Sequence, residues 1–269
     1  MNVHKLLTDF WNVPAIIAGL RKGVWIHQED CAVKLMWKEM GLLDEYGLTD
    51  EGSKVVQCGN LFKYTFLAAF AQAQEDRPEK TPENYKLLRD GLGSYFEFAI
   101  APRIKKILPF ELPDGLRFLD FCGGSGHLSK YLVNSIGMAG MLVDRTKPVV
   151  ESDGFRFLKA DVVKHPESVI GIGNFDLVVA SEIFHCKNRQ TVRFWLNELF
   201  PKLVREGGAI LVVERIPTLE FKWRMEAFSD GGDNYEIQNL EADIGKTWKI
   251  TSYEVIPEGS HWLAILQRW

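Results

Sequence analysis

A glycine-rich turn constrains this chain more than any other feature of its sequence. Residues 120–126 read Asp-Phe-Cys-Gly-Gly-Ser-Gly, between a mostly apolar run at 116–119 and a helix-like run at 127–136. Glycines in such a turn let the backbone approach a ligand where a Cβ atom would clash. The start of the following helix adds free N–H groups and the positive end of a helix dipole. The strand, turn and helix together predict a nucleotide-type binding site.

The order of residues in the turn separates the kinds of nucleotide site. A P-loop ends in Gly-Lys-Ser/Thr, and a dinucleotide site reads Gly-x-Gly-x-x-Gly, whereas the order here is Asp-x-Cys-x-Gly-x-Gly. Asp120 at the strand end also argues against a phosphate, because a carboxylate repels phosphate and attracts an ammonium. The turn resembles motif I of class I S-adenosylmethionine (SAM)-dependent methyltransferases, Asp/Glu-x-Gly-x-Gly-x-Gly, with Cys122 at the first glycine.

This resemblance implies SAM as the cofactor, with S-adenosylhomocysteine as its product. Asp120 and Cys122 then belong to the cofactor site, and Gly123, Gly124 and Gly126 leave room for the methionine part. The plainer alternative is a strand-to-helix connection that binds nothing.

Acidic residues end the next two predicted strands. Residues 140–144 end in Asp144, whose carboxylate can accept both ribose hydroxyls, as in nucleotide-binding sheets generally. Residues 155–161 end in Asp161, which the methyltransferase pattern places beside the adenine amino group. Polar residues commonly end strands, so it is their order after the glycine turn that favours SAM. The implied cofactor site is completed by Arg145, Val162 and Ser181, which adjoin strand ends.

The remaining pattern predicts an α/β fold. Residues 175–180 and 208–214 read as further strands, the first nearly continuously apolar and therefore buried. Alternation of strands and helices from residue 116 predicts a largely parallel sheet covered on both faces. Residues 248–255 and 261–267 predict an antiparallel hairpin at its edge. The expected fold is a Rossmann-like, seven-stranded SAM methyltransferase sheet over residues 111–269.

Residues 1–110 are expected to form a mostly helical, winged-helix-like domain for dimerisation and substrate binding. Residues 48–52, Leu-Thr-Asp-Glu-Gly, resemble the wing of winged-helix folds, with a tight turn before them and a new helix start. Such a fold invites a DNA-binding interpretation, but the candidate recognition helix at 31–40 carries only Lys34 and Lys38 as cations. Phosphate binding needs more cations, so packing against another subunit or the catalytic domain is favoured.

Composition narrows the classes of function. The 269 residues suffice for two domains, and the net charge of −4 favours neither nucleic acid nor an anionic membrane as partner. No apolar run reaches the ~20 residues that span a bilayer, and the first residues lack a signal-peptide pattern. The absence of a Cys-x-x-Cys spacing disfavours a zinc site and fits a reducing cytoplasm. The four cysteines are Cys31, Cys58, Cys122 and Cys186.

A winged-helix-like part followed by a SAM-binding sheet resembles the small-molecule O-methyltransferase family. Plant phenolic enzymes and bacterial polyketide or antibiotic tailoring enzymes of secondary metabolism belong to it. The resemblance covers nearly the whole chain. It implies a small, aromatic or polyketide-like substrate and a homodimer formed through the N-terminal helices.

The resemblance also implies the catalytic residues. The family's base is a histidine after the fourth strand, in a Leu-x-x-x-Leu-His-Asp-Trp-like segment, and His185 stands at that place. A histidine suits the task because its pKa lies near working pH, so kcat/KM is expected to fall on the acid side near the imidazole pKa. Glu214 matches the acid that orients the histidine. Asn234 stands where the family has a second acid, and Cys186-Lys187 replaces Asp-Trp, so the site departs from the pattern.

Several alternatives stay open at this stage. Transfer to nitrogen or carbon is not separated from transfer to oxygen. The altered residues around His185 also allow a SAM-binding enzyme that does not methylate, and the alternative interpretation of His185 is a loop histidine without a role. A winged-helix regulator that senses SAM is disfavoured by the weakly cationic helix at 31–40. Nucleic-acid adenine methylation is disfavoured because Asp/Asn-Pro-Pro-Tyr is absent after the fourth strand.

Overall fold

The chain divides into two compact units, residues 1–98 and residues 99–269. A computed structural model describes 100–108, 115–150, 152–216, 235–256 and 261–269, together with a few residues before them. Those earlier residues are 38, 42–44, 47–50, 52–53 and 96. The remaining N-terminal helices that the sequence predicts, and Lys34 with them, lie outside the described residues.

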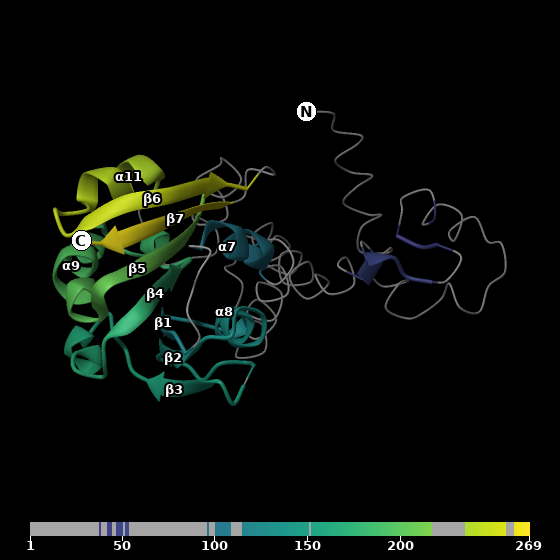
Figure 1. Ribbon diagram of the computed structural model, residues 1–269, viewed down its shortest axis with the longest axis horizontal. Coiled ribbons are helices and arrows are strands. Elements are labelled where there is room, and N and C mark those ends of the chain that lie inside the picture. Colours follow the sequence, from purple (N-terminus) through teal and green to yellow (C-terminus); the bar gives the residue numbers. More distant parts are fainter. Residues whose placement is uncertain are drawn as a thin grey trace, which may run out of the picture. The chain divides into compact units, whose positions relative to one another are not determined.

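A seven-stranded sheet in the order β3-β2-β1-β4-β5-β7-β6 forms the second unit (Figure 1). Every strand pair is parallel except the two that involve β7, which runs antiparallel to both β5 and β6. This is the sheet expected from the sequence, including its antiparallel C-terminal hairpin, so the predicted fold class is confirmed. The strands are β1 (Arg117–Phe121), β2 (Ala139–Asp144), β3 (Phe155–Lys159), β4 (Phe175–Ser181), β5 (Val204–Arg215), β6 (Trp248–Val255) and β7 (His261–Arg268).

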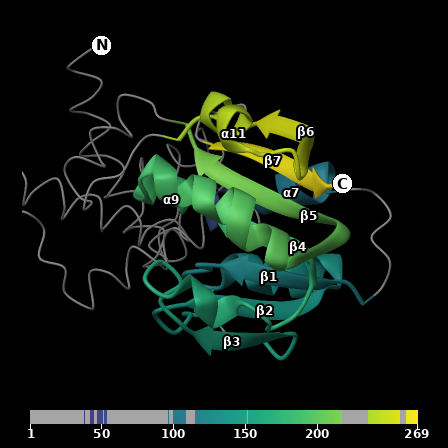
Figure 2. The same cartoon turned by 90° about the vertical axis from the view of Figure 1, so that its left-hand side faces the viewer.

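Helices cover both faces of the sheet. α7 (Ala101–Ile107) and α8 (His127–Tyr131), which continues as η2 (Leu132–Ile136), lie on one face, and α9 and α11 lie on the other (Figures 1 and 2). The helix expected after His185 is present as α9 (Arg189–Phe194), η5 (Trp195–Leu199) and η6 (Phe200–Lys202). The other helices among the described residues of the second unit are η3 (Pro166–Val169), η4 (Phe184–Cys186) and α11 (Ile237–Asp243).

The main hydrophobic core lies between the sheet and α9. In β1, Leu119 and Phe121 belong to this core, whereas Phe118 and Asp120 belong to the opposite face, as the alternation of a strand requires. The Phe121 ring packs edge-on against Trp195 in η5, with 5.1 Å between ring centroids. The core therefore anchors β1, and with it the start of the glycine turn.

The order of strands reverses between β1 and β4. β1 leads outward to β2 and β3 on one side, and β4 leads to β5 on the other. Ligands of open α/β sheets bind at such a switch point, outside the carboxyl ends of the strands. The predicted glycine turn follows β1 and the predicted histidine follows β4, so both fall at this point.

In the first unit, residues 42–44, 47–50, 52 and 53 confirm the tight turn and helix start that the sequence predicts. Leu43 and Leu48 form an isolated antiparallel bridge. The Thr49 hydroxyl accepts the Gly52 N–H at 3.1 Å, as a helix N-cap does. A Cβ atom on Gly52 would lie 2.1 Å from the Leu42 carbonyl oxygen, so the close approach of these segments requires glycine.

Candidate active site

The glycine turn has an unusual backbone with an open outer side. Cys122, Gly124 and Gly126 all have positive φ, at 60°, 54° and 85°. A left-handed conformation costs a residue such as Cys122 about 1–2 kcal/mol, and Cys122 adopts this conformation despite the cost. A Cβ atom on Gly123 would lie 2.5 Å from the Asp120 Cγ, whereas one on Gly124 would meet nothing nearer than 3.9 Å. The turn therefore wraps around Asp120 on its inner side and leaves space outside Gly124.

Asp120 lies beneath the turn and is fully buried. Its Oδ2 accepts the Ser129 hydroxyl of α8 at 2.7 Å, and its Oδ1 has no hydrogen-bond partner within the described part of the chain. Burial raises the pKa of Asp120 to about 7, although the Ser129 hydrogen bond opposes the shift. Asp120 thus joins β1 to α8, and its contact with a ligand stays a prediction.

Asp144 closes the turn from the end of β2. Its Oδ2 accepts the Gly124 N–H at 3.1 Å, and its Oδ1 accepts the Thr146 N–H at 2.8 Å. Each carboxylate oxygen has a further lone pair, so both can still accept a hydroxyl. The half-buried carboxylate lies at the carboxyl end of β2, and its contact with a ribose stays a prediction.

The other predicted cofactor residues follow neighbouring strand ends. Asp161 lies two residues beyond β3, and its backbone carbonyl accepts the His165 N–H at 2.8 Å. The Val162 side chain is buried and belongs to the core, Arg145 is exposed, and Ser181 is half-buried at the end of β4. The structure thus brings these residues to one edge of the sheet.

The N–H groups of the turn show which ligand chemistry fits. Those of Gly123 and Gly126 donate to the carbonyls of Val143 and Gly123, and that of Gly124 donates to Asp144. A phosphate site instead aims such N–H groups at the ligand. A turn in which these three N–H groups are used internally and whose neighbours are carboxylates suits a neutral nucleoside with a cationic tail, which is the chemistry of SAM.

His185 and Glu214 form a buried pair near this site. η4 carries His185 directly after β4, and β5 carries Glu214 near its end. His185 Nδ1 contacts Glu214 Oε1. Glu214 Oε2 accepts the N–H groups of Phe184 and His185, at 2.8 and 3.2 Å, and Oε1 accepts the Arg215 N–H at 2.9 Å. With Nδ1 bound by Glu214, a substrate would meet Nε2.

The environment of His185 changes its expected titration. Burial alone would lower the pKa of the His185 imidazole, but the Glu214 carboxylate, together with Cys186, raises it to about 10. At neutral pH we therefore expect His185 to be mainly in its imidazolium form. The acid limb of kcat/KM is therefore expected at higher pH than the ordinary imidazole pKa, where the sequence places it. The sequence does not reveal how closely the two side chains approach, so it does not predict this shift.

A second charged cluster beside this pair was not predicted from the sequence. Glu182, directly after β4, contacts Arg215 and His261, which come from β5 and β7. An acid three residues before His185 is the sole sequence signal, since the partners meet only when the sheet forms. Asn234 and the segment 217–234 lie outside the described residues, so the predicted role of Asn234 stays a prediction.

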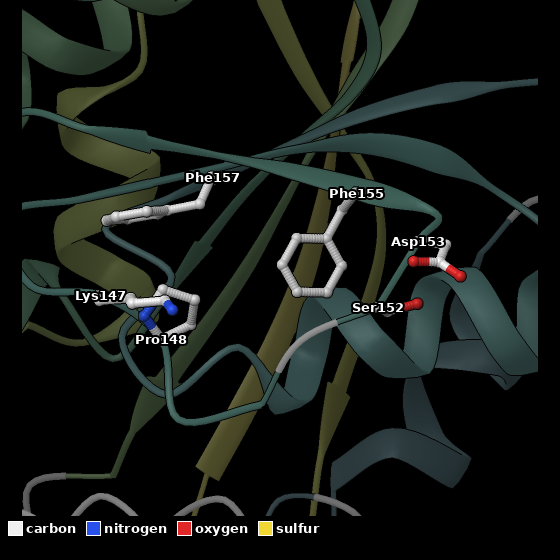
Figure 3. Close-up of a pocket in the computed structure, with 6 residues that line it drawn as sticks. All are labelled: Lys147, Pro148, Ser152, Asp153, Phe155 and Phe157. Carbon is white, nitrogen blue, oxygen red and sulfur yellow. The ribbon is translucent and has the colours of Figure 1, made fainter.

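A separate pocket of about 430 Å³ lies against one face of β3 (Figure 3). Its lining contains none of the predicted site residues; it consists of Lys147, Pro148, Ser152, Asp153, Phe155 and Phe157. In the stretches 145–150 and 152–154, which connect β2 to β3, there is no helix. A parallel crossover normally carries one, so this face of β3 is less covered than usual.

Two points concern the described residues alone. No group of three or more histidine, cysteine, aspartate or glutamate side chains there could hold a metal ion. No helix there is long and apolar enough to cross a membrane.

Solved structures share this fold over the whole chain. An O-methyltransferase family protein from Burkholderia thailandensis is 15% identical, with TM-score 0.68 over 100% of this chain and 98% of its own. The pyocyanin biosynthetic protein PhzM is 13% identical, with TM-score 0.68 and the same coverage. Human N-acetylserotonin methyltransferase, solved in complex with SAM, is 14% identical, with TM-score 0.61 over 100% and 98%.

No protein-family model and no curated protein matches the sequence. At these identities the likeness shows the fold, which is that of small-molecule O-methyltransferases with a SAM-binding sheet. The activity has to be argued from the site itself.

Proposed function

We propose that this protein is a SAM-dependent methyltransferase that methylates a hydroxyl group of a small, aromatic or polyketide-like molecule. The observation that supports this most is the position of the buried His185–Glu214 pair. His185 follows β4 and Glu214 lies near the end of β5, at the same edge of the sheet as the glycine turn that follows β1. A candidate base and a candidate cofactor site therefore share one edge of the sheet.

The residues at this edge fit the cofactor. Asp144 would hold the ribose, Asp161 the adenine, and the open side of Gly124 the methionine part. Bound SAM supplies a methyl group on a positively charged sulfonium, which a nucleophilic oxygen can take. The protein's main contribution is then to hold donor and acceptor at near-attack distance.

His185 is proposed as the general base. Its Nε2 would accept the hydroxyl proton, while Glu214 holds Nδ1 and stabilises the imidazolium. Because the pKa of His185 is raised to about 10, the fraction of neutral imidazole grows as pH rises through the physiological range. We therefore expect kcat/KM to increase with pH up to about 10.

Calorimetric titration with SAM and with S-adenosylhomocysteine tests the cofactor site. The wild type should bind both, and Asp144→Ala should weaken binding about 10- to 100-fold, because hydrogen bonds to a charged group contribute about 1.5–3 kcal/mol. Asp153→Ala is the matched control, since this exposed acid lines the separate pocket. Folded wild type that binds neither ligand would refute the proposal.

A further inference from the structure

Glu182 has a backbone conformation that is rare outside glycine. Its φ is +53°, and a left-handed residue of this kind costs about 1–2 kcal/mol. The Glu182 N–H donates to the Val213 carbonyl at 2.8 Å, which ties it to β5. Residues with backbone strain of this kind are concentrated at functional sites. The contacts of the Glu182 side chain are therefore candidates for a functional role.

With this backbone conformation, the Glu182 carboxylate lies among charged and titratable side chains. Its Oε1 lies 2.6 Å from Nε2 of His261, the fully buried first residue of β7. Arg215 Nη2 lies 3.2 Å from the same carboxylate. Arg215 and His261 face each other in the β5–β7 register, so Glu182 joins the ends of three strands.

This cluster is continuous with the His185–Glu214 pair. The Arg215 N–H donates to Glu214 Oε1, the oxygen that contacts His185 Nδ1, while the Arg215 side chain reaches Glu182. The connected charged groups are Glu182, Glu214, Arg215, His185 and His261, and Cys186 is the other titratable group next to His185.

Glu182 is the negatively charged member at the centre of this network. Burial would raise the pKa of Glu182, but Arg215 and His261 hold it far below its usual range, so Glu182 is ionised. His185 is also among the groups that lower the pKa of Glu182, so the Glu182 carboxylate and a protonated His185 stabilise each other.

We propose that Glu182 is a positioning residue for His185: fixed by Arg215 and His261, it supplies a second carboxylate that stabilises the imidazolium and holds the Glu214 end of β5 in place. The proposal rests on the proposed role of His185 in methyl transfer. A merely structural cluster would hold the strand ends together and leave the titration of His185 unchanged, so the two interpretations differ in a measurable property.

The test is an NMR titration of His185 in protein labelled at the histidine rings, without any acceptor substrate. In Glu182→Gln the His185 pKa should fall by on the order of one pH unit, since an ionised neighbour of opposite charge typically shifts a pKa by that much or more. Glu254→Gln is the matched control: Glu254 also pairs with an arginine, Arg103 at 3.1 Å, and is 18% exposed against 21% for Glu182. That control should leave the His185 pKa unchanged.

Two further variants test whether the charge of Glu182 is what shifts the His185 pKa. Glu182→Asp keeps the charge and should restore most of the His185 pKa. Arg215→Gln removes a cation from the network and should raise it, which keeps the proposal testable if Glu182→Gln does not fold. An unchanged His185 pKa in folded Glu182→Gln, or in Arg215→Gln, would overturn the proposal.

The titration also separates this inference from the proposed function. It needs no turnover, so a shifted His185 pKa supports the role of Glu182 even if no acceptor is methylated. Where methyl transfer is measured, the acid limb of kcat/KM should move to lower pH in Glu182→Gln. Methyl transfer with an unmoved acid limb would leave the proposed function intact and remove Glu182 from it.

Discussion

At the scale of single residues, two acids at neighbouring strand ends have opposite environments. Asp120 is fully buried and is hydrogen-bonded by Ser129, whereas Asp144 is half-buried and accepts two backbone N–H groups from Gly124 and Thr146. The first therefore resists ionisation and the second is available to hydroxyl donors. The two residues look alike in the sequence. They differ in the structure because alternation along β1 places Asp120 beneath the turn.

Asp120→Asn should change how stability depends on pH. The folded-state pKa of Asp120 is about 7 against an ordinary value of 3.8, so the folded protein binds the proton more tightly than the unfolded chain. Its contribution to stability is complete below about pH 4 and is lost as pH rises through 7. The variant should lose less stability than the wild type between about pH 4 and pH 8. Chemical denaturation across this range measures the difference, and parallel curves would contradict the burial argument.

At the scale of elements, the glycine turn depends on two different properties of its glycines. Gly123 is needed because a Cβ atom would overlap Asp120 and Leu142, at 2.5 and 2.7 Å. Gly124 has open space around it, so its positive φ is the main reason for glycine there. The difference predicts distinct effects of adding one methyl group.

Gly123→Ala should destabilise the protein by about 1–3 kcal/mol, because overpacking forces neighbours to move. Gly124→Ala should cost only about 1 kcal/mol for its left-handed backbone, but it should weaken SAM binding, because the methyl group enters the proposed cofactor space. Thermal unfolding and calorimetry of the two variants separate these effects. Equal SAM affinity of Gly124→Ala and wild type would place the cofactor elsewhere.

α11 is attached to α9 through one carboxylate. Asp243 accepts from Arg189 at 2.9 Å, from Arg193 at 2.6 Å and from the Tyr235 hydroxyl at 3.2 Å. The Tyr235 ring packs edge-on against Phe184, the neighbour of His185, with 5.1 Å between centroids. Tyr235, two residues before α11, therefore links the Asp243 carboxylate of α11 to Phe184 of η4.

Asp243→Asn should lower the free energy of unfolding by about 1–3 kcal/mol, the range for losing hydrogen bonds to a charged group. The exposed arginine side chains keep the effect toward the lower end, since solvent screens them. The His185 pKa should stay unchanged, because the Asp243 carboxylate interacts with Arg189, Arg193 and Tyr235. A large shift of that pKa by NMR would show that α11 controls the site electrostatically as well.

At the scale of the whole molecule, the sheet was predictable because its signals are local. The strand at 140–144, the acid that ends it and the glycine turn before it each follow from neighbouring residues. The expected strand at 155–161 is shorter in the structure and ends at Lys159, so Asp161 follows it in a turn. The contact of Glu182 with His261 was not predictable, because it depends on a positive φ at a non-glycine residue and on a partner strand far along the chain.

The central claim is that His185 acts as the base of a SAM-dependent methyl transfer. The measurement that tests it most directly is transfer of a labelled methyl group from SAM to a panel of small phenols, by the wild type and by His185→Asn. The wild type should label a hydroxyl oxygen, at a rate that rises with pH up to about 10. The variant should be slower by about 10²–10⁴-fold, the usual contribution of a general base, with unchanged calorimetric affinity for SAM. Equal rates in both proteins would contradict the account.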